Sequence, residues 1–153
     1  MKSKEIIKPE EIEEIIRNSD VCYIGFSDGE EPYVLPFNFG YTEDTVWLHS
    51  GPGGKKHDFI KKNNKVCIVF SSHHDLHFHH KTVACSYSMR FKSVVAYGTI
   101  EYVEEYEEKV KALDVIMKQY VKRDFTYSEP SVKNVCVFKV KLTEKTGKMR
   151  GYV

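Results

Sequence analysis

The sequence contains few cysteines, few prolines and no long uncharged apolar run, and each scarcity narrows the class of protein. The four cysteines are widely separated and form no CxxC pair, so no paired-cysteine motif is present. Each lies in an apolar, strand-like run, where a thiol behaves as a small hydrophobic side chain. We expect buried, reduced thiols in a cytoplasmic protein at these positions: Cys22, Cys67, Cys85 and Cys136.

The chain also lacks an excess of charge of either sign. Its 23 basic and 22 acidic residues leave a formal net charge of +1, so the global balance predicts no attraction to nucleic acid or to acidic membranes. The N-terminal sequence MKSKEIIKPEEIEEIIRNSD has no apolar signal core, and no window reaches the roughly 18 uncharged residues of a membrane-spanning helix. The sequence therefore predicts a soluble, unexported protein of the cytoplasm, in which any anion binding is local.

What the sequence does contain is enough apolar material for one domain. With 153 residues, the chain is predicted to fold as a single domain over residues 1–153. Isoleucines at helical spacing predict a helix from Pro9 to about Asn18, and apolar residues at spacings of three and four predict an amphipathic helix over residues 106–120. The apolar stripe of the second helix consists of Tyr106, Val110, Leu113, Met117 and Tyr120.

Short strand-like runs fill most of the remaining chain. The runs VCYIGFS, PYVLPFNFGY and VWLHS predict a meander, and KVCIVFS and NVCVFKVKL predict further strands. Residues 82–103 form an extended run that is predicted to bend near Ser93 and Gly98, giving two strands. Mostly antiparallel strands with a few helices indicate an α+β fold, and a closed or half-open barrel is favoured because it hides the edges of the sheet.

The run PYVLPFNFGY has two different faces. One face is apolar and is predicted to be core: Tyr33, Leu35, Phe37, Phe39 and Tyr41. The other face holds Val34, Pro36 and Asn38. Because proline cannot donate to a sheet ladder, Pro36 indicates an edge strand, a bulge, or backbone turned toward something other than a strand, such as a ligand.

Three groups of polar residues are candidate sites. SGPGGKK places small residues before a predicted helix that starts at Lys55, and free N–H groups and two lysines there could hold phosphate, although such a turn is often only a solvated connection. Arg90, Lys92 and Ser93 form a second polar group, which either contacts an anion or faces water. His49 ends an apolar strand and titrates near neutral pH, which fits either proton transfer or a structural hydrogen bond.

The segment SSHHDLHFHH is rich in histidine and is predicted to be a loop. Imidazole is a common ligand of transition metals, but neither a cysteine pair nor an HExxH spacing accompanies these histidines. The pattern favours adventitious metal affinity or a proton-sensitive loop over a dedicated metal site. The histidines concerned are His73, His74, His77, His79 and His80.

Four of these runs, in the order PYVLPFNFGY, VWLHSGPGGKK, NNKVCIVF and MRFKSVVAYG, resemble the flavoproteins related to pyridoxamine 5′-phosphate oxidase, especially the branch of nitroimidazole-resistance proteins. The resemblance spans roughly residues 9–120. It implies a mainly antiparallel split β-barrel of six or seven strands with a few peripheral helices. It also implies a homodimer with FMN bound at the subunit interface.

The resemblance assigns site residues as well. In this family the backbone of the second strand borders the flavin, and a conserved order of small residues and lysines holds the phosphate. His49 corresponds to a histidine that is associated with the active site, so it is the candidate catalytic residue. The cofactor-binding residues implied in this way are Val34, Leu35, Pro36, Phe37, Asn38, His49, Ser50, Lys55, Lys56, Arg90, Ser93 and Val94. No metal ligand is implied.

The function implied by the resemblance is an FMN-dependent oxidoreductase acting on a small molecule. Nitroreduction is the specific candidate, and NAD(P)H is a candidate electron donor although no GxGxxG fingerprint is present. Two other classes stay open: a flavin-binding protein without turnover, and a haem- or metal-binding split barrel that uses the histidine-rich segment. The sequence has no equivalent of the substrate-binding arginine and histidine of true pyridoxamine phosphate oxidases, so their reaction is not carried over.

Overall fold

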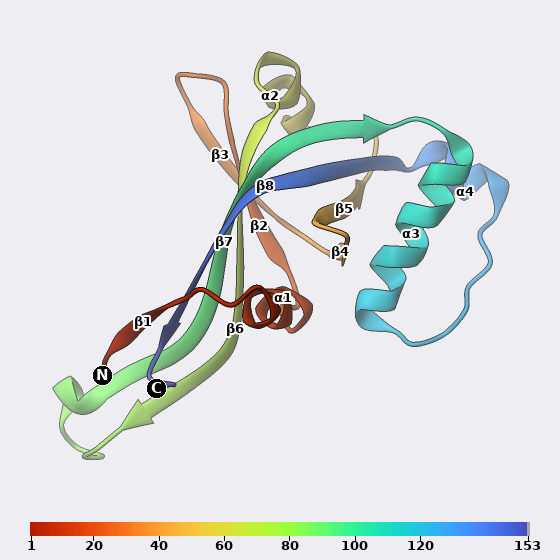
Figure 1. Ribbon diagram of the computed structural model, residues 1–153. Coiled ribbons are helices and arrows are strands. Elements are labelled where there is room, and N and C mark those ends of the chain that lie inside the picture. Colours follow the sequence, from red (N-terminus) through yellow and green to blue (C-terminus); the bar gives the residue numbers. More distant parts are fainter. Residues whose placement is uncertain (153) are drawn as a thin grey trace.

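The computed structural model describes residues 1–152 and shows a curled β-sheet with helices around it (Figure 1). Within that part of the chain the strands are β1 (Ser3–Ile6), β2 (Cys22–Ser27), β3 (Pro32–Phe37), β4 (Phe39–Thr42), β5 (Thr45–Ser50), β6 (Lys65–Phe78), β7 (Tyr87–Val103) and β8 (Cys136–Arg150). The α-helices are α1 (Pro9–Arg17), α2 (Lys56–Lys62), α3 (Tyr106–Tyr120) and α4 (Glu129–Asn134), and a 3₁₀ turn covers Ala84–Ser86. No helix among the described residues is long and apolar enough to cross a membrane.

The strands pair antiparallel in the order β3-β2-β6-β7-β8-β5-β4, and β1 is added beside β8. β3 and β4 stand at opposite ends of this order, yet only Asn38 separates them in the chain. The chain therefore leaves β2 at one end of the sheet and joins β5 at the other, so the sheet curls into a barrel that is split at Asn38. This confirms the predicted α+β split barrel. Residues 1–152 contain eight strands because the predicted strand over 32–41 is divided and residues 3–6 add another.

Strands β6 and β7 extend beyond their other partner strands as a two-stranded ribbon, residues 75–90 (Figure 1). The histidine-rich segment leads into this ribbon and is part of β6, so the prediction of a loop is wrong. A register shift between Ser72 and Asp75, with His73 at a φ of 56°, absorbs an irregularity without ending the ladder. A strand that extends outside the barrel needs no continuous buried face. The histidine-rich segment therefore lacks the buried apolar run by which a strand is recognised in a sequence.

The predicted division of residues 82–103 into two strands is wrong, because β7 is one continuous, curved strand (Figure 1). A register shift in its pairing with β8 falls between Tyr97 and Gly98. At Gly98 a Cβ would lie 2.4 Å from the carbonyl oxygen of Lys141, so only glycine allows this close approach. The glycine therefore marks a bulge inside one strand rather than a boundary between two.

Helix α1 covers the barrel core, as predicted, by burying Ile12, Ile15 and Ile16. Helix α3 packs against β4 and β5 through a stripe that lies one residue before the predicted one. Its buried residues are Ala112 and Ile116, and the aromatic ends of the predicted stripe are exposed. The cause is the close approach of the helix backbone to β4, which decides the orientation of α3 more strongly than the width of its apolar stripe.

The cysteines are free thiols in different environments. Cys22 is buried, as predicted, and burial raises the pKa of its thiol to about 12. Cys67 and Cys136 are half-buried. Cys85 is exposed in the 3₁₀ turn at the tip of the ribbon, so the prediction of a buried thiol is wrong there. The apolar neighbours of Cys85 in the sequence lie outside the barrel and have no core to enter.

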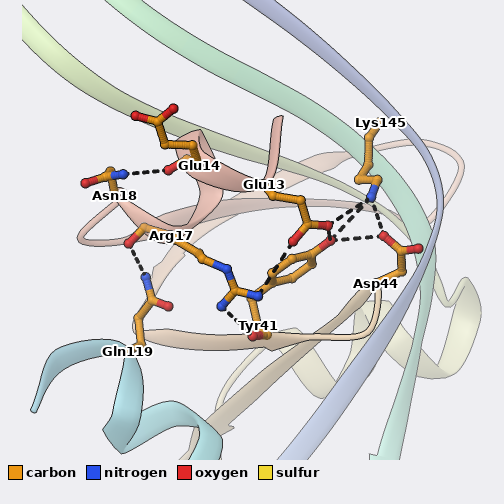
Figure 2. A network of polar contacts seen from close by, with 8 residues as sticks. All are labelled: Glu13, Glu14, Arg17, Asn18, Tyr41, Asp44, Gln119 and Lys145. Carbon is orange, nitrogen blue, oxygen red and sulfur yellow. Dashed lines mark hydrogen bonds and ion pairs between the residues drawn. The ribbon is translucent and has the colours of Figure 1, made fainter. Parts of the chain in front are cut away.

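A half-buried polar network joins α1, β4 and β8 (Figure 2). The hydroxyl of Tyr41 lies 2.8 Å from Glu13 Oε1 and 3.0 Å from Asp44 Oδ1, and its one proton is donated to either of these carboxylates. Lys145 Nζ contacts Asp44 and donates to the Tyr41 hydroxyl oxygen at 3.3 Å. Arg17 pairs with Glu13 at 3.6 Å. Burial, followed by the two carboxylates, raises the pKa of Tyr41, so its hydroxyl stays protonated and holds the network together.

Candidate functional site

A cavity of about 280 Å³ opens where β3 passes into β4 and β5 ends. Seven residues line it, and every one of them belongs to the set that the sequence predicted. They are Leu35, Pro36, Phe37, Asn38, His49, Ser50 and Lys56. We call this cavity the crossing pocket. The structure thus brings together residues that lie on three different segments of the chain.

The crossing pocket exists because the ladder is interrupted at this point. β4 and β5 pair only as far as Phe39 and Leu48, so Asn38 and His49 lie just beyond the last pair. β3 has β2 as its one partner strand among the described residues, and Pro36 therefore lies in an edge strand, where a missing N–H costs nothing. On the edge away from β2, the backbone from Pro36 to Asn38 has no partner strand among residues 1–152 and lines the pocket.

The two faces of β3 differ as the sequence indicated. Phe37 is buried in the core and Leu35 is half-buried against it. Val34, Pro36 and Asn38 point to the other side and are exposed. The strand therefore anchors one face in the core and presents the other to the pocket and the outer surface of the barrel.

His49 lies at the mouth of the crossing pocket on β5, paired through its backbone with Val137 of β8. Loss of water around the ring lowers the pKa of the His49 imidazole below its ordinary value of 6.5. The imidazole is therefore neutral at neutral pH, with one N–H donor and one nitrogen acceptor. Among the described residues no side chain makes a hydrogen bond with it, so it is free to meet a ligand.

The two adjacent lysines of the glycine-rich turn point in different directions. Lys56 is only 9% exposed, lines the crossing pocket and donates from Nζ to the carbonyl oxygen of Gly53 at 2.6 Å. Lys55 is 60% exposed at its side chain and pairs with Glu31 at 3.7 Å, away from the pocket. Successive residues at the start of a helix point about 100° apart, which explains the separation. The structure brings Lys56, but not Lys55, to the pocket.

The three predicted residues of β7 do not line the crossing pocket. Val94 is fully buried in the core, so its side chain is inaccessible to a ligand. Arg90 and Ser93 point to opposite faces of β7, because side chains alternate along a strand. Arg90 donates to His77 Nδ1 at 3.1 Å and pairs with Asp75 at 3.7 Å, so the ribbon itself holds its guanidinium group.

Ser93 belongs to a face of the sheet that sequence reasoning missed. Backbone pairing aligns Val34 with Gly25, Cys67 and Tyr97 in one row, and Pro36 with Tyr23, Val69 and Val95 in the next. These side chains point away from the barrel core and are exposed or half-buried. We call the set the outer barrel face: Tyr23, Val34, Pro36, Cys67, Val69, Ser93, Val95 and Tyr97. The alternation of side chains within each strand was visible in the sequence. The residues that lie next to one another on adjacent strands were not.

A second cavity of about 510 Å³, also missed from the sequence, lies behind the glycine-rich turn. His57 and Tyr102 form one wall, with 2.7 Å between His57 Nδ1 and the Tyr102 hydroxyl oxygen and the rings stacked at 5.7 Å. Burial, and then the charges of Lys56 and Lys61, lower the pKa of His57. His57 follows the two lysines directly, but its partner Tyr102 is 45 residues away, and no sequence signal links the two.

The histidines of the ribbon do not converge on a common point. His77 and His79 lie with ring centroids 5.0 Å apart, and His74 Nε2 is 2.6 Å from the hydroxyl of Ser71. Within residues 1–152 no group of three or more histidine, cysteine, aspartate or glutamate side chains is placed to hold a metal ion.

The curled antiparallel sheet, split at Asn38 and bearing a pocket at the split, defines the class of protein as an α+β split barrel. A family model described as pyridoxamine 5′-phosphate oxidase matches residues 8–149, nearly the whole chain. This protein belongs to that family.

Solved structures agree with the family. A candidate 5-nitroimidazole antibiotic resistance protein from Bacteroides thetaiotaomicron is 48% identical, covers 97% of this chain and 87% of its own, and superposes with a TM-score of 0.85. An FAD- and haem-binding protein from Mycobacterium smegmatis has the same fold at 12% identity, with 97% and 74% of the two chains covered and a TM-score of 0.83. A flavocytochrome from Azotobacter vinelandii shares the fold at 18% identity, with 95% and 69% covered and a TM-score of 0.78. Curated protein sequences gave no match.

Proposed function

We propose that this protein is an FMN-dependent oxidoreductase of the cytoplasm that reduces a small molecule, specifically a nitroreductase acting on nitroimidazole-type compounds. The observation that carries the proposal is the crossing pocket, which joins His49, Lys56 and the free backbone of β3. Membership of the pyridoxamine 5′-phosphate oxidase family supports a flavin cofactor. The 48% identity to the candidate 5-nitroimidazole resistance protein supports the substrate class.

The residues of the crossing pocket fit FMN. We assign the phosphate to Lys56, whose ammonium group retains donors beyond its one bond to Gly53, and to the adjacent turn, where a Cβ at Gly51 or Gly53 would meet nothing within 4 Å. Hydrogen bonds between an ammonium group and a phosphate are about twice as strong as neutral ones. The backbone from Pro36 to Asn38 is assigned to the edge of the flavin ring. When bound, FMN supplies the hydride or electron transfer.

A homodimer completes this site in the proposal. The crossing pocket of about 280 Å³ is smaller than a typical small-molecule site of roughly 300–1,000 Å³, so one protomer supplies only part of it. The outer barrel face begins at Pro36, beside the pocket, and carries exposed apolar side chains that a second copy would cover. Ser93 lies on this same side of β7 and faces the other copy in such a dimer. Arg90 and Val94 have no side-chain role, because one pairs with Asp75 and the other is in the core.

His49 is assigned to substrate binding or proton exchange at a ring nitrogen. Its neutral imidazole can donate one hydrogen bond and accept one at the mouth of the pocket. NAD(P)H is the proposed electron donor. No carboxylate among the described residues orients the His49 ring, and this observation favours a second candidate function, a flavin-binding protein without turnover of its own.

The two lysines provide a matched test of the cofactor site. Lys56→Ala removes a charged donor from the crossing pocket, and hydrogen bonds to a charged group are worth about 1.5–3 kcal/mol, so FMN affinity should fall roughly tenfold or more. Lys55→Ala, the neighbouring control, should change it little because Lys55 points away. Affinity is measured by fluorescence titration, with far-UV circular dichroism to show that both variants fold and Lys56→Arg to restore the charge. Equal affinities in the wild type and Lys56→Ala would refute the phosphate assignment.

Turnover separates the enzyme from the carrier. Purified protein loaded with FMN is mixed with NADH or NADPH and a 5-nitroimidazole, and consumption of the nicotinamide is followed by absorbance. Reduction of the nitro compound with stoichiometric FMN supports the nitroreductase. Bound FMN without consumption of either nicotinamide supports the flavin carrier, and an absorption spectrum with a haem Soret band but no flavin bands would reject both.

A further inference from the structure

The ribbon has one apolar face. Backbone pairing places Leu76 opposite Met89 and Phe78 opposite Tyr87, with the last two rings stacked at 4.7 Å between centroids. The four side chains are 59%, 45%, 43% and 36% exposed in that order. We call this set, Leu76, Phe78, Tyr87 and Met89, the ribbon apolar face. So many large apolar side chains gathered on a projecting element indicate an interaction surface rather than scattered surface residues.

The opposite face of the ribbon is polar and is occupied by this chain. Arg90 bonds to His77 and pairs with Asp75 across the strands. Met1 and Gly151, from the two ends of the chain, lie against this side and line a cavity of about 450 Å³ with these residues. The polar face is therefore partly bonded within this chain, although Nε of Arg90 has no hydrogen-bond partner among the described residues. The ribbon apolar face is not covered in this way. Its four residues remain 36% to 59% exposed within residues 1–152.

The ribbon apolar face continues the outer barrel face. β7 is one strand, and residues two apart along it share a side, so Tyr97, Val95 and Ser93 point the same way as Met89 and Tyr87. The register shift between Ser72 and Asp75 keeps Leu76 and Phe78 on that side too. One apolar surface thus extends from Pro36, at the crossing pocket, along β7 to the tip of the ribbon.

We propose that the ribbon is an arm whose apolar face packs against a second copy of this chain. This inference rests on the homodimer in the proposed function, and it extends that interface from the barrel to the ribbon. A second copy fits because a single partner must cover both parts of a continuous surface, and the proposed homodimer would place a copy of the chain on one of them. The net charge of +1 gives little repulsion between copies. The paired positions of the ribbon apolar face carry no lysine or arginine, and the tip adds only Lys81, whereas apolar groups at an anionic lipid surface are accompanied by several basic side chains.

The test removes apolar side chains from the ribbon apolar face while the pairing of β6 with β7 is retained. Leu76→Thr with Met89→Thr puts a β-branched, hydrogen-bonding pair at opposed positions, so the ladder is retained while apolar area is lost. Ile7→Thr with Val121→Thr is the matched control, because both residues are exposed elsewhere on the surface. Sedimentation velocity over a dilution series gives the dimer dissociation constant of the wild type and of each variant. Circular dichroism and FMN titration of the same samples report folding and the flavin site.

We expect the ribbon variant to raise the dimer dissociation constant roughly tenfold or more, and the control to leave it unchanged. Equal dissociation constants for the ribbon variant and the wild type would overturn the arm, while the homodimer and FMN site would stand. A wild type that is monomeric at every concentration would overturn both the arm and the homodimer, and the FMN titration would then judge the cofactor assignment alone. Binding of the wild type to phosphatidylglycerol vesicles that only the ribbon variant loses, with unchanged dimerisation, would replace the second copy by a lipid surface.

Discussion

The crossing pocket and the ribbon are both made by exposed strand segments, but they rest on different supports. At the pocket, the exposed side of β3 is backed by Phe37 and the barrel core, so its polar groups are held in place by buried neighbours. In the ribbon, β6 and β7 lie outside the barrel core, and residues 1–152 leave the ribbon apolar face exposed. A strand with a buried side holds its other side in place, whereas a strand without a buried side leaves its apolar residues exposed.

This difference teaches that alternation of polar and apolar residues has two meanings. In the barrel, the apolar member of each pair is buried and the polar member faces a pocket or water. In the ribbon, Leu76 and Phe78 alternate with Asp75 and His77 in the same way, yet both sets are outside the core. The pattern identifies a strand with two unlike faces, and only the position of the strand decides what the apolar face contacts.

The largest effect that separates the two regions is expected at Gly40 in the barrel wall. A Cβ at this position would lie 2.5 Å from the carbonyl carbon of Val115 in α3. Gly40→Val should therefore lower the free energy of unfolding by about 3 kcal/mol or more, because neither backbone can move without repacking the core. Urea denaturation measures the change.

Gly53→Ala is the control for this prediction, since a Cβ at Gly53 would meet nothing within 4 Å. It should change the free energy of unfolding by no more than about 0.5 kcal/mol. Equal stability of Gly40→Val and the wild type would show that α3 does not pack against β4 as described.

A smaller effect is expected from the polar network of the barrel. Lys145 is the first cause that lowers the pKa of Asp44 below its ordinary value of 3.8. A lowered carboxyl pKa stabilises the fold above pH 3.8, and this stabilisation is lost as the pH falls through the folded-state value. Lys145→Met should cost at most about 1 kcal/mol at pH 7, because Asp44 is largely exposed. The difference from the wild type should shrink below pH 3.8, as measured by urea denaturation at both pH values.

The ribbon supplies the comparison for this ion pair. Asp75→Asn breaks the pair with Arg90, which is separated by 3.7 Å and open to water, so it should cost only a few tenths of a kcal/mol. If Asp75→Asn lowered the free energy of unfolding as much as Lys145→Met does, the ion pair of the ribbon would contribute as much stability as the polar network of the barrel.

The smallest effect concerns His49. Its lowered pKa predicts that the imidazole protonates below pH 6.5, which can be followed by the NMR shifts of its ring protons. A depressed histidine pKa stabilises the fold above the unfolded value and loses this contribution as the pH falls through the folded value. The wild type should therefore lose slightly more stability than His49→Gln between neutral and acidic pH. A pKa at or above 6.5 would contradict the partial loss of water around the ring.

The accuracy of the sequence predictions varied with the distance between cooperating residues. Residues 34–38, His49 and Ser50 were predicted in short ordered runs, and those that line the crossing pocket meet there because each run ends at the same break in the ladder. Lys55 and Lys56 were equivalent in the sequence, but helix geometry sends them apart. The pairing of Arg90 with Asp75 could not be foreseen, because the segment between them was predicted as a loop.

The sequence by itself determined the strand-rich α+β class, the helices α1 and α3, and the residues that line the crossing pocket. These features follow from local alternation, from Pro36 and from glycine, whose effects act over a few residues. The tertiary structure alone decided that Lys56 rather than Lys55 enters the pocket, that Ser93 and Arg90 face opposite ways, and that the histidine-rich segment belongs to a strand. The physical reason is that strand register and helix orientation are set by contacts between segments far apart in the chain, which no local pattern contains.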